Sequence, residues 1–587
     1  MKRTQLAAAV LLATGSVSAM AATYSVTPLP LQDTAVNNFA RSIDNSGKML
    51  TVVQREFNPP VDVDQLENDT TFFTQFGAAL ENEDDALQGV FTDADYTLIV
   101  NYLLSNVGAT QGQKLAEYRT YITDTQDFSL VPGLDQVTDK FDDYTFSVEA
   151  TGRDSLNGDF IVGDSAGLVV LDPYENEDGD TINYTYAEST QQAFVQVAGN
   201  TTKLPPVDDT LGGYASAQSV NENLQVAGYS SVSFLDVVND AIDNCADPEA
   251  RTDISEGRCR SNVYSGSFVV PRIDTYFINA STRTRALASF VLAAEVNATI
   301  WQLDATGDVI STQTFPLLFE REEDDTNHYY SYAFSINNQG IAVGEALTGD
   351  RVSVTRPNSS ALLESERVAT VYRDGETIEL LPRDENILSQ AIDINDNNWV
   401  AGAVLRSRSD IARSRLFAYN LDTQEQYYPD GFFTSSGVTP NAINNNNIIV
   451  GKADSVISND SIRQTAAFMY NIETQEFTDL NDLIACDSDY ELVEAVDIND
   501  NNEIIANARV KNTNRYATGV DIINSDGETE LVDNIIAVKL SPLSNGNIEE
   551  CEIPDDEQPY ERQGASMGWL GVLALLGVAL MRRRIKK

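Results

Sequence analysis

A short Asn-rich segment that recurs along the chain constrains its fold more than any other feature. The three clearest copies span residues 391–402, 442–451 and 495–506. Each copy is an apolar run, a turn of Asn and Asp residues, and a second run of β-branched residues. Asn, Asp and Gly tolerate the positive φ angles that tight turns need, so each copy predicts a β-hairpin.

Looser copies of this hairpin bring the number to seven, and they begin at Ser42, Ser155, Ser219 and Ser335. A second unit lies between them and alternates apolar and polar residues around a turn, most clearly at residues 193–205, 371–382, 416–419 and 467–480. Such alternation is also typical of hairpins. Two hairpins per repeat, at a spacing of about 50–60 residues in the C-terminal half, describe a four-stranded propeller blade.

The sequence therefore predicts an all-β fold, a β-propeller of seven four-stranded blades, within residues 22–544. Residues 24–30 look like half of a blade, and the last hairpin, around residues 520–532, lacks a following partner. Joining these two ends would close the ring and leave no long unpaired edge. An open array of repeats, or two separate β domains, is the alternative.

Two insertions interrupt the repeats. Residues 68–123 predict a small helical region, in which Asp93 could cap a helix with one apolar face; the aromatic and apolar residues Phe72, Phe73, Phe76, Leu115, Tyr118 and Ile122 suggest two further helices. Residues 233–276 contain a helical stretch and two cysteines. Insertions at one rim of a repeat protein often form its binding surface.

The charge of the chain narrows the choice of partners. Its 89 acidic residues against 38 basic ones give a formal net charge of -51. Nucleic acids and anionic membrane surfaces need a basic footprint, so neither is an expected partner.

The four cysteines predict two disulfides. Sequence order suggests the pairs Cys245–Cys259 and Cys486–Cys551. The alternative is a zinc site, but the chain has no C-x-x-C pair and its one histidine is His328.

The two ends of the chain predict export. A basic start, a short apolar run and an Ala19-x-Ala21 site make residues 1–21 a signal peptide read by the Sec machinery. Residues 545–566 are expected to be an acidic linker, and residues 567–587 a C-terminal transmembrane helix followed by basic residues. This tail resembles the GlyGly-CTERM sorting tail of Gram-negative bacteria, with Gly564 and Ala565 at the Gly-Gly position. The resemblance implies processing by a rhombosortase-like protease and type II secretion to the cell surface; a plain C-terminal anchor is the alternative.

The paired motifs A-F-x-Y…G…L-P and I-N-x-x-G-x-V-V-G resemble the HAF repeat of extracellular proteins. Over nearly the whole chain, together with the tail, the sequence also resembles the bacterial domain-of-unknown-function 3466 family. The resemblance implies an exported repeat protein and transfers no catalytic residues.

Calcium is the cofactor that the turns suggest. Oxygen donors stand at alternating positions, as in the first half of a calcium loop, at Asp393, Asn395 and Asn397 and at Asp497, Asn499, Asn501 and Glu503. The glycine and the bidentate glutamate of a complete loop are missing, so turn formation explains the pattern more simply.

A Ser-His-Asp or Cys-His site would have to use His328, the one histidine of the chain, and no catalytic motif accompanies it. The sequence therefore favours an exported, non-enzymatic propeller at the cell envelope or surface that binds a protein or glycan. Two alternatives stay open: a secreted carbohydrate-active enzyme with paired carboxylates, and a structural surface protein stiffened by calcium.

Overall fold

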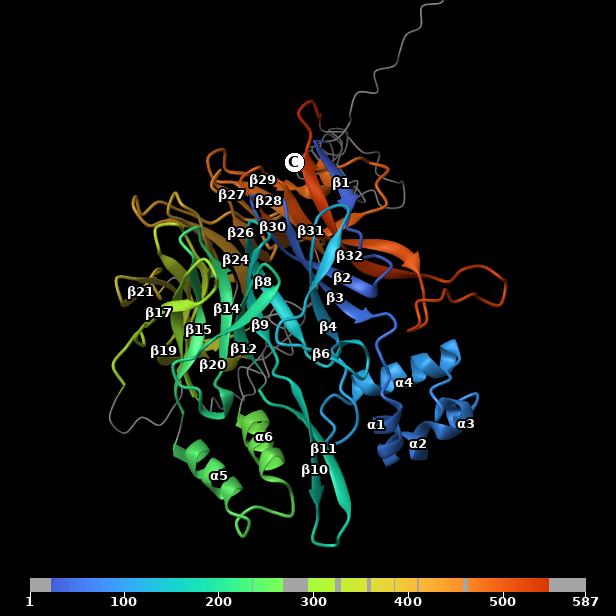
Figure 1. Ribbon diagram of the computed structural model, residues 1–587. Coiled ribbons are helices and arrows are strands. Elements are labelled where there is room, and N and C mark those ends of the chain that lie inside the picture. The colour runs from blue at the N-terminus through green and yellow to red at the C-terminus, as the bar shows by residue number, and fades with distance from the viewer. Residues whose placement is uncertain are drawn as a thin grey trace, which may run out of the picture. The chain divides into compact units, whose positions relative to one another are not determined.

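The computed structural model (Figure 1) describes residues 23–189, 191–234, 236–267, 294–321, 329–355, 361–384, 386–408, 411–457 and 463–547. The predicted signal peptide and sorting tail, with Gly564 and Ala565, lie outside these residues, as do His328 and Cys551. The described residues belong to one compact unit. Within the described ranges, no helix is both long enough and apolar enough to cross a membrane.

Seven four-stranded antiparallel sheets follow one another along the chain. The strands of the first three, from the first to the fourth strand of each, are β2 (Ala35–Ile43), β3 (Met49–Glu56), β4 (Tyr118–Thr123) and β5 (Phe128–Val131); β8 (Ala150–Leu156), β9 (Phe160–Ser165), β12 (Gln192–Val197) and β13 (Asn200–Leu204); and β14 (Ala215–Val220), β15 (Gln225–Phe234), β16 (Ala294–Leu303) and β17 (Val309–Thr314).

The next three sheets repeat this order. Their strands are β18 (Ser331–Ile336), β19 (Ala342–Val354), β20 (Leu362–Arg373) and β21 (Glu376–Glu379); β22 (Leu388–Ile394), β23 (Trp399–Arg408), β24 (Ile411–Asn420) and β25 (Gln426–Tyr427); and β26 (Val438–Ile443), β27 (Ile448–Asp454), β28 (Thr465–Asn471) and β29 (Glu476–Asp479). All seven predicted Asn-rich hairpins thus join the first and second strands of a blade.

The seventh blade joins the two ends of the described chain. Its first three strands are β30 (Glu491–Ile498), β31 (Ile504–Thr513) and β32 (Leu531–Pro542), and its fourth strand is β1 (Tyr24–Pro28). β1 runs antiparallel to β32, from Tyr24 opposite Pro542 to Pro28 opposite Val538. The first strand of each blade contacts the first strand of the next, and β30 contacts β2. The sheets therefore close into a ring around these first strands, a seven-bladed β-propeller, as predicted.

A glycine and an aromatic ring explain why the two sequence motifs recur together. A Cβ atom added to the second-strand glycines Gly163, Gly228, Gly344, Gly402 or Gly451 would lie within 2.4 Å of a carbonyl oxygen on the first strand. The ring of a buried third-strand aromatic crowds the same space in four of these blades, at Phe194, Trp301, Phe417 and Phe468. Only glycine fits there, and the ring that covers it forms part of the core between blades.

The innermost strand of every blade carries a β-bulge at the same place. One residue is left out of the pairing with the second strand, shortly before the Asn turn: Arg41, Arg153, Gln218, Phe334, Ile392, Asn441 and Val496. A bulge re-aims the side chain that follows it. The residues directly after the bulges are Ser42, Asp154, Ser219, Ser335, Asp393, Ala442 and Asp497, and they are central to the candidate site.

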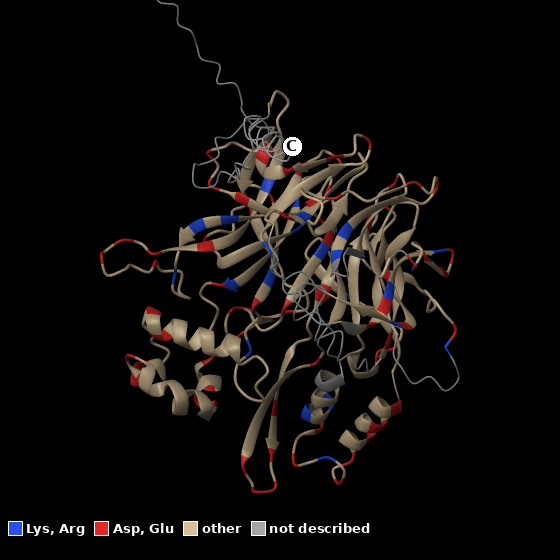
Figure 2. Cartoon of the chain, turned by 180° about the vertical axis from the view of Figure 1, so that it is seen from behind, with Lys and Arg blue, Asp and Glu red and all other residues tan. Residues whose placement is uncertain are grey.

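Strand order gives the ring two faces. We call the end with the turns between first and second strands the turn face, and the opposite end, where second strands connect to third strands, the insertion face. The insertion face carries α1 (Val63–Asn68), α2 (Thr70–Phe76), α3 (Glu83–Ala86) and α4 (Asp93–Ser105), the hairpin of β10 (Val169–Glu175) and β11 (Thr181–Ala187), and α5 (Asp236–Ala246) and α6 (Glu256–Ser267). Figures 1 and 2 show these elements along the bottom of the propeller.

Both predicted insertions are present, with two corrections. Tyr118 and Ile122 do not lie in a helix but in β4, where they pair with β3 as the third strand of the first blade. The last predicted hairpin, around residues 520–532, is a short turn at Asp526 and Gly527 in the loop before β32, where Ile523 pairs with Thr529; the last described strand of the chain is β32. In both places, pairing with a distant strand outweighs the local pattern.

Candidate functional site

The Asn-rich turns share one local geometry. In the fifth blade, the Asn395 backbone N–H donates to Trp399 O, and the Asn398 N–H donates to Asn395 O. The side-chain oxygen of Asn395 accepts the N–H groups of Asn397 and Trp399 at 3.1 and 3.0 Å. The fourth turn residue has positive φ, as at Asn398 (60°). Asn suits both positions, because it accepts from its own backbone and tolerates a left-handed conformation.

The same asparagines also connect neighbouring blades. Asn395 Nδ2 donates to Asn444 O at 2.8 Å, and Asn444 Nδ2 donates to Asn499 O at 3.0 Å. The series continues in the other turns as Asn221 to Asn337, Asn337 to Asn395, and Asn499 to Asp44. It forms an arc over six of the seven blades, which we call the Asn ladder. Asp44, at its end, accepts local N–H groups as the asparagines do but has no amide to donate.

Three carboxylates lie directly after bulges and contact the next blade. An oxygen of Asp154 accepts the Val220 N–H at 2.9 Å. Asp393 accepts Ile443 N–H at 2.7 Å, and Asp497 accepts Ile43 N–H at 2.8 Å. Each bond runs from one blade to the next, so these carboxylates help to join blades.

Burial sets the protonation of these three groups. It raises the pKa of Asp497 to about 8, and the charges of Asp154 and Asp393 add to the shift. Burial also raises the pKa of Asp154 to about 6, and it raises that of Asp393. The three side chains are half-buried by exposed area. For Asp154 and Asp497 the partial exposure is explained by the pocket that both residues line. At neutral pH the protonated carboxyl of Asp497 thus lies within electrostatic reach of Asp154, which is largely ionised there.

That pocket lies at the centre of the turn face. It has a volume of about 210 Å³ and is lined by residues from all seven blades. Its acidic lining residues are Asp44, Asp154, Glu222, Asp396, Asp497 and Asp500. No lysine, arginine or histidine is among the lining residues. The pocket is therefore polar and acidic, and all five asparagines of the Asn ladder line it.

The seven residues suggested for calcium lie in the turns of the fifth and seventh blades, where they support the fold. The Asn395 and Asn499 oxygens each accept two backbone N–H groups. Glu503 binds Lys539 at 2.7 Å, and Asn397 Nδ2 donates to Asn445 O. In the part of the chain that the structure describes, no three His, Cys, Asp or Glu side chains are close enough together to hold a metal ion. Calcium binding by the turns stays a prediction.

The insertion face is built differently. The loop between β31 and β32 reaches α4, where Thr518 Oγ1 donates to Asp93 at 2.6 Å. The chain after α4 reaches β11, where Thr185 Oγ1 donates to Gly112 O at 2.8 Å. The β10–β11 hairpin then contacts the chain between α5 and α6, since Tyr174 donates to Asp253 at 2.9 Å. Insertions of four consecutive blades are thus joined side by side, and we call them the insertion collar.

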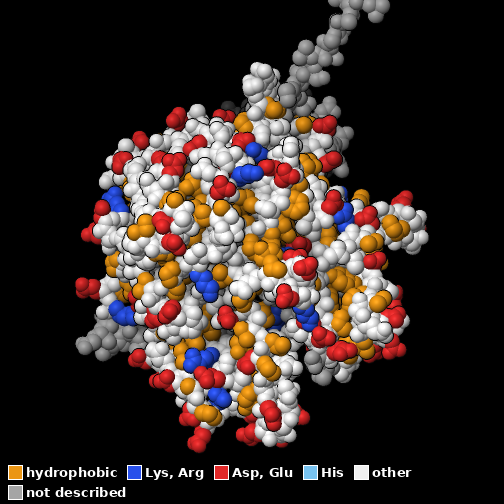
Figure 3. Space-filling view, viewed as in Figure 1, with side chains coloured by type: hydrophobic (Ala, Val, Ile, Leu, Met, Phe, Trp, Pro, Cys, Tyr) orange, Lys and Arg blue, Asp and Glu red, His pale blue; other side chains and the backbone are white. Residues whose placement is uncertain are grey.

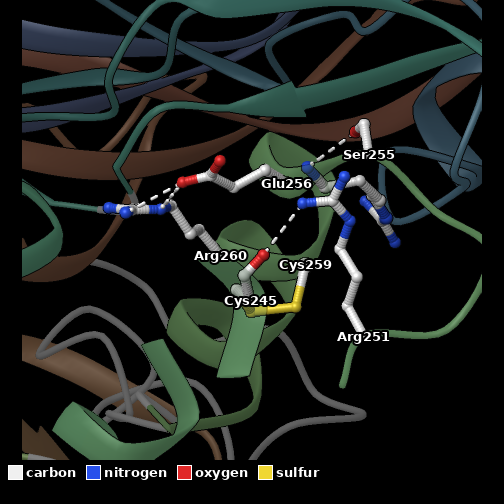
Figure 4. Close-up of a disulfide and its surroundings, with 7 residues drawn as sticks. Cys245, Arg251, Ser255, Glu256, Cys259 and Arg260 are labelled. Carbon is white, nitrogen blue, oxygen red and sulfur yellow. Dashed lines mark hydrogen bonds and ion pairs between the residues drawn. A yellow bond between two sulfur atoms is a disulfide. The ribbon is translucent and has the colours of Figure 1, made fainter. Parts of the chain in front are cut away.

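A disulfide fixes the last member of the collar (Figure 4). Cys245 at the end of α5 is bonded to Cys259 in α6, with 5.5 Å between their Cα atoms, which confirms the predicted pair. Arg251, between the two helices, donates to Cys245 O at 3.1 Å. Cys486 is also disulfide-bonded, whereas Cys551, its predicted partner, lies outside the described residues.

The collar exposes apolar side chains as well as acidic ones (Figure 3). Its exposed large apolar residues are Val90, Val107, Leu171, Val237, Val520 and Ile523. They come from all four insertions of the collar, and contiguous exposed apolar surface is typical of an interaction site.

The sequence did not predict the post-bulge carboxylates, although a signal for them was present. When the copies are aligned on their turns, Asp393 and Asp497 stand at one position, two residues before the ladder asparagines Asn395 and Asn499, whereas Asp154 stands two residues before Leu156, in a blade that contributes no asparagine to the ladder. Asp393 and Asp497 were proposed as calcium ligands, and Asp154 was not proposed at all. The bulge that turns them toward the next blade has no residue signature, because seven positions carry six residue types.

A ring of seven blades closed by strands from both ends of the chain defines the class of this protein as a seven-bladed β-propeller with a collar of insertions on one face. The family model described as "Protein of unknown function (DUF3466)" matches residues 1–584. The chain belongs to that family, as the resemblance predicted.

Comparisons with other proteins add little. None of the curated proteins matches the chain. Among solved structures it is similar to the β-propeller domain of the Trilobed protease from Pyrococcus furiosus, with 10% identity, a TM-score of 0.25, and coverage of 66% of this chain and 92% of that one. It is also similar to fructan 1-exohydrolase IIa from Cichorium intybus, with 12% identity, a TM-score of 0.17, and coverage of 41% and 52%. At these scores neither likeness carries an argument, so the propeller assignment comes from the strand pairing of the chain itself.

Proposed function

We propose that this chain is an exported cell-envelope or surface protein that binds a protein or glycan on its insertion collar without chemically changing it. The observation that carries the proposal is the collar itself: insertions of four consecutive blades, joined by side-chain hydrogen bonds and fixed by a disulfide. Surfaces of this kind on rigid scaffolds are where repeat proteins bind their partners.

Export is the second part of the proposal. The Cys245–Cys259 disulfide supports it, because such bonds persist in oxidising compartments. In this proposal the Sec machinery reads residues 1–21, and a rhombosortase-like protease cuts near Gly564 and Ala565 before type II secretion. The HAF-like repeats fit the same extracellular setting. The mass of the protein recovered from culture medium and from membranes tests both cuts.

Binding is tested with the full mature chain on arrays of glycans and of purified surface proteins. We expect Leu171→Asp, on the exposed edge of β10, to weaken binding by about tenfold, because it places a charge in an apolar contact. Ile310→Asp is the matched control: Ile310 is 65% exposed, Leu171 is 54% exposed, and Ile310 lies on the outermost strand β17, away from the collar. Equal loss in both variants, or in neither, would refute the collar as the binding surface.

One observation favours a second candidate, a carbohydrate-active enzyme. Asp497 with a pKa raised to about 8 and Asp154 with a pKa raised to about 6 both line the central pocket, and an acid beside an ionised carboxylate is what glycoside cleavage needs. Each of them also joins blades, which explains their burial without catalysis. Turnover of a glycan by the wild type that Asp497→Asn abolishes, with binding retained, would favour the enzyme.

A further inference from the structure

Three arginines gather around one aspartate on the insertion face, between the fifth and sixth blades. Arg413 and Arg415 lie near the start of β24, Arg463 lies two residues before β28, and Asp454 lies at the end of β27. Their side chains are exposed by only 17%, 12%, 4% and 15% respectively. In a chain with a formal charge of -51, this concentration of buried positive charge stands out. We call it the arginine cluster.

One carboxylate oxygen serves two of these arginines. Asp454 Oδ2 lies 3.1 Å from Arg463 Nη1 and 3.8 Å from Arg413 Nη1. The same oxygen also accepts the Gly437 N–H at 2.9 Å. Among the described residues, the cluster therefore holds more positive charge than the Asp454 carboxylate neutralises. Burial lowers the pKa of Arg413, and the neighbouring charge of Arg463 lowers it further.

The third arginine, Arg415, adds to this excess of positive charge. Arg415 binds backbone carbonyls of the loop between the fifth and sixth blades, with Nη1 at 2.9 Å from Ser436 O. Arg415 Nη1 also lies 3.9 Å from the carboxylate of Asp430, whose side chain is 65% exposed. An exposed pair at that distance contributes little. The role of Arg415 is to hold the loop in place.

One donor of the cluster has no acceptor. The Nε–H of Arg463 is buried and makes no hydrogen bond within the described residues. The rest of that side chain is held in place, because Nη1 donates to Ser435 O at 3.0 Å and the guanidinium lies 5.7 Å from the Phe433 ring centroid. A buried unpaired donor on a fixed cation is costly, and an acceptor with negative charge would remove that cost.

We propose that the arginine cluster is a binding site for an oxyanion, the carboxylate, sulfate or phosphate group of a ligand, held by the Arg413 guanidinium and the Arg463 Nε–H. Guanidinium groups bind such oxygens through paired, charge-assisted hydrogen bonds. This inference rests on the proposed function, and it specifies that the ligand bound on the insertion face is acidic. A free inorganic anion and the acidic group of a glycan or protein are the two sources of that chemistry.

The test uses the full mature chain at constant ionic strength. Calorimetric titration and melting curves are recorded with sodium sulfate, with an oligogalacturonate and with a neutral galactose oligosaccharide of equal length. We expect saturable binding of the two acidic probes and none of the neutral one. Arg413→Gln should weaken binding of both acidic probes by about tenfold, because it removes one charge-assisted pair. Stronger binding of oligogalacturonate than of sulfate identifies a glycan as the source; stronger sulfate binding identifies a free anion.

Two further variants keep the test decisive. Arg413→Lys retains the charge but loses the planar fork, so it should weaken binding less than Arg413→Gln does, and it serves as the test if Arg413→Gln folds poorly. Arg373→Gln removes an exposed arginine at the far end of β20 and should change nothing. Equal binding by Arg413→Gln or Arg413→Lys and the wild type would overturn the proposal.

The two proposals fail separately. Loss of acidic-probe binding in the Arg413 variants, with binding on the arrays unaffected by Leu171→Asp, would support the cluster and refute the collar. The reverse result would support the collar and refute the cluster.

Discussion

At the scale of single residues, the post-bulge aspartates are the groups whose chemistry departs most from that of a free side chain. Asp497 accepts one N–H from the first blade and lies within the electrostatic reach of Asp154 and Asp393. A carboxyl group in this setting keeps its proton well above pH 4. Folding therefore takes up a proton that the unfolded chain releases.

We predict that the free energy of unfolding falls as pH rises from about 4 to about 8. The pKa of Asp497 is raised to about 8 in the folded protein, so between these pH values the folded state binds more protons than the unfolded state. The slope is at most about 1.4 kcal/mol per pH unit for one such proton. Urea unfolding at a series of pH values measures it, and Asp497→Asn should flatten the curve in this range.

The control for this prediction has the opposite sign. Asp533 binds Lys511 at 2.8 Å, which lowers the pKa of its carboxyl group. The stability from that pair is present above the unfolded pKa and is lost only at more acidic pH. Asp533→Asn should therefore leave the slope between pH 5 and 8 unchanged. A wild-type stability that stays constant or rises over this range would contradict the burial of Asp497.

The hydrogen bonds and pKa values of single residues could be predicted only where their partners are close in sequence. The Asn turns follow from the sequence because an asparagine meets its own backbone two and four residues later. The raised pKa of Asp497 does not, because it depends on Asp154 and Asp393, which are 343 and 104 residues away in sequence. The arginine cluster was missed for the same reason. Arg413, Arg463 and Asp454 belong to three strands or loops that have no common motif.

At the scale of elements, each Asn turn both folds its own hairpin and bonds to the next blade. Asn395 shows the two functions on one side chain, since its oxygen accepts from the turn and its nitrogen donates to Asn444 O and Asn447 Oδ1. Asp44 occupies the same position in the first blade and performs only the first function. Asp44 therefore shows what an Asn-to-Asp substitution does at this position: the turn is kept, and the bond to the next blade is lost.

We predict that Asn395→Asp destabilises the fold by about 1–2 kcal/mol and Asn395→Ala by roughly 3 kcal/mol. Aspartate keeps the turn and loses the bonds to the sixth blade, whereas alanine loses both. Asn524 is the matched control, because its side-chain oxygen accepts N–H groups in the same turn geometry but on an exposed loop. Asn524→Asp should be neutral within about 0.5 kcal/mol. If both Asp variants unfold at the same urea concentration, the Asn ladder contributes nothing between blades.

Strands and helices could be predicted from the sequence where the repeat is regular, and not where a strand is separated along the chain from its partner in the sheet. The seven hairpins were recognisable because each carries its own turn. β4 was mistaken for a helix, since the helical insertion lies between it and β3, its partner in the sheet. The last predicted hairpin, around residues 520–532, is only the short turn before β32, so most of β32 was not predicted. In both cases the missing information is the partner strand.

At the scale of the whole molecule, the ring depends on a single short strand. β1 is the only strand of the seventh blade that comes from the N-terminal end, and it covers the edge of β32. Tyr24 and Leu29 are buried there, with 7% and 1% of their surface exposed. The sequence could predict this closure, because residues 24–30 repeat the fourth-strand pattern without a blade of their own.

We predict that removal of residues 22–30 lowers the free energy of unfolding by about 3–6 kcal/mol, the contribution expected from burying Tyr24 and Leu29. The exposed edge of β32 should also make the truncated chain self-associate, because an unpaired edge strand is a template for further pairing. Adding a peptide of residues 22–32 in excess should raise the melting temperature and reverse the association, whereas a scrambled peptide should do neither. A truncated chain that stays monomeric and melts with the wild type would mean that the blades hold their ring without β1, and closure by strands from both ends would then be dispensable for stability.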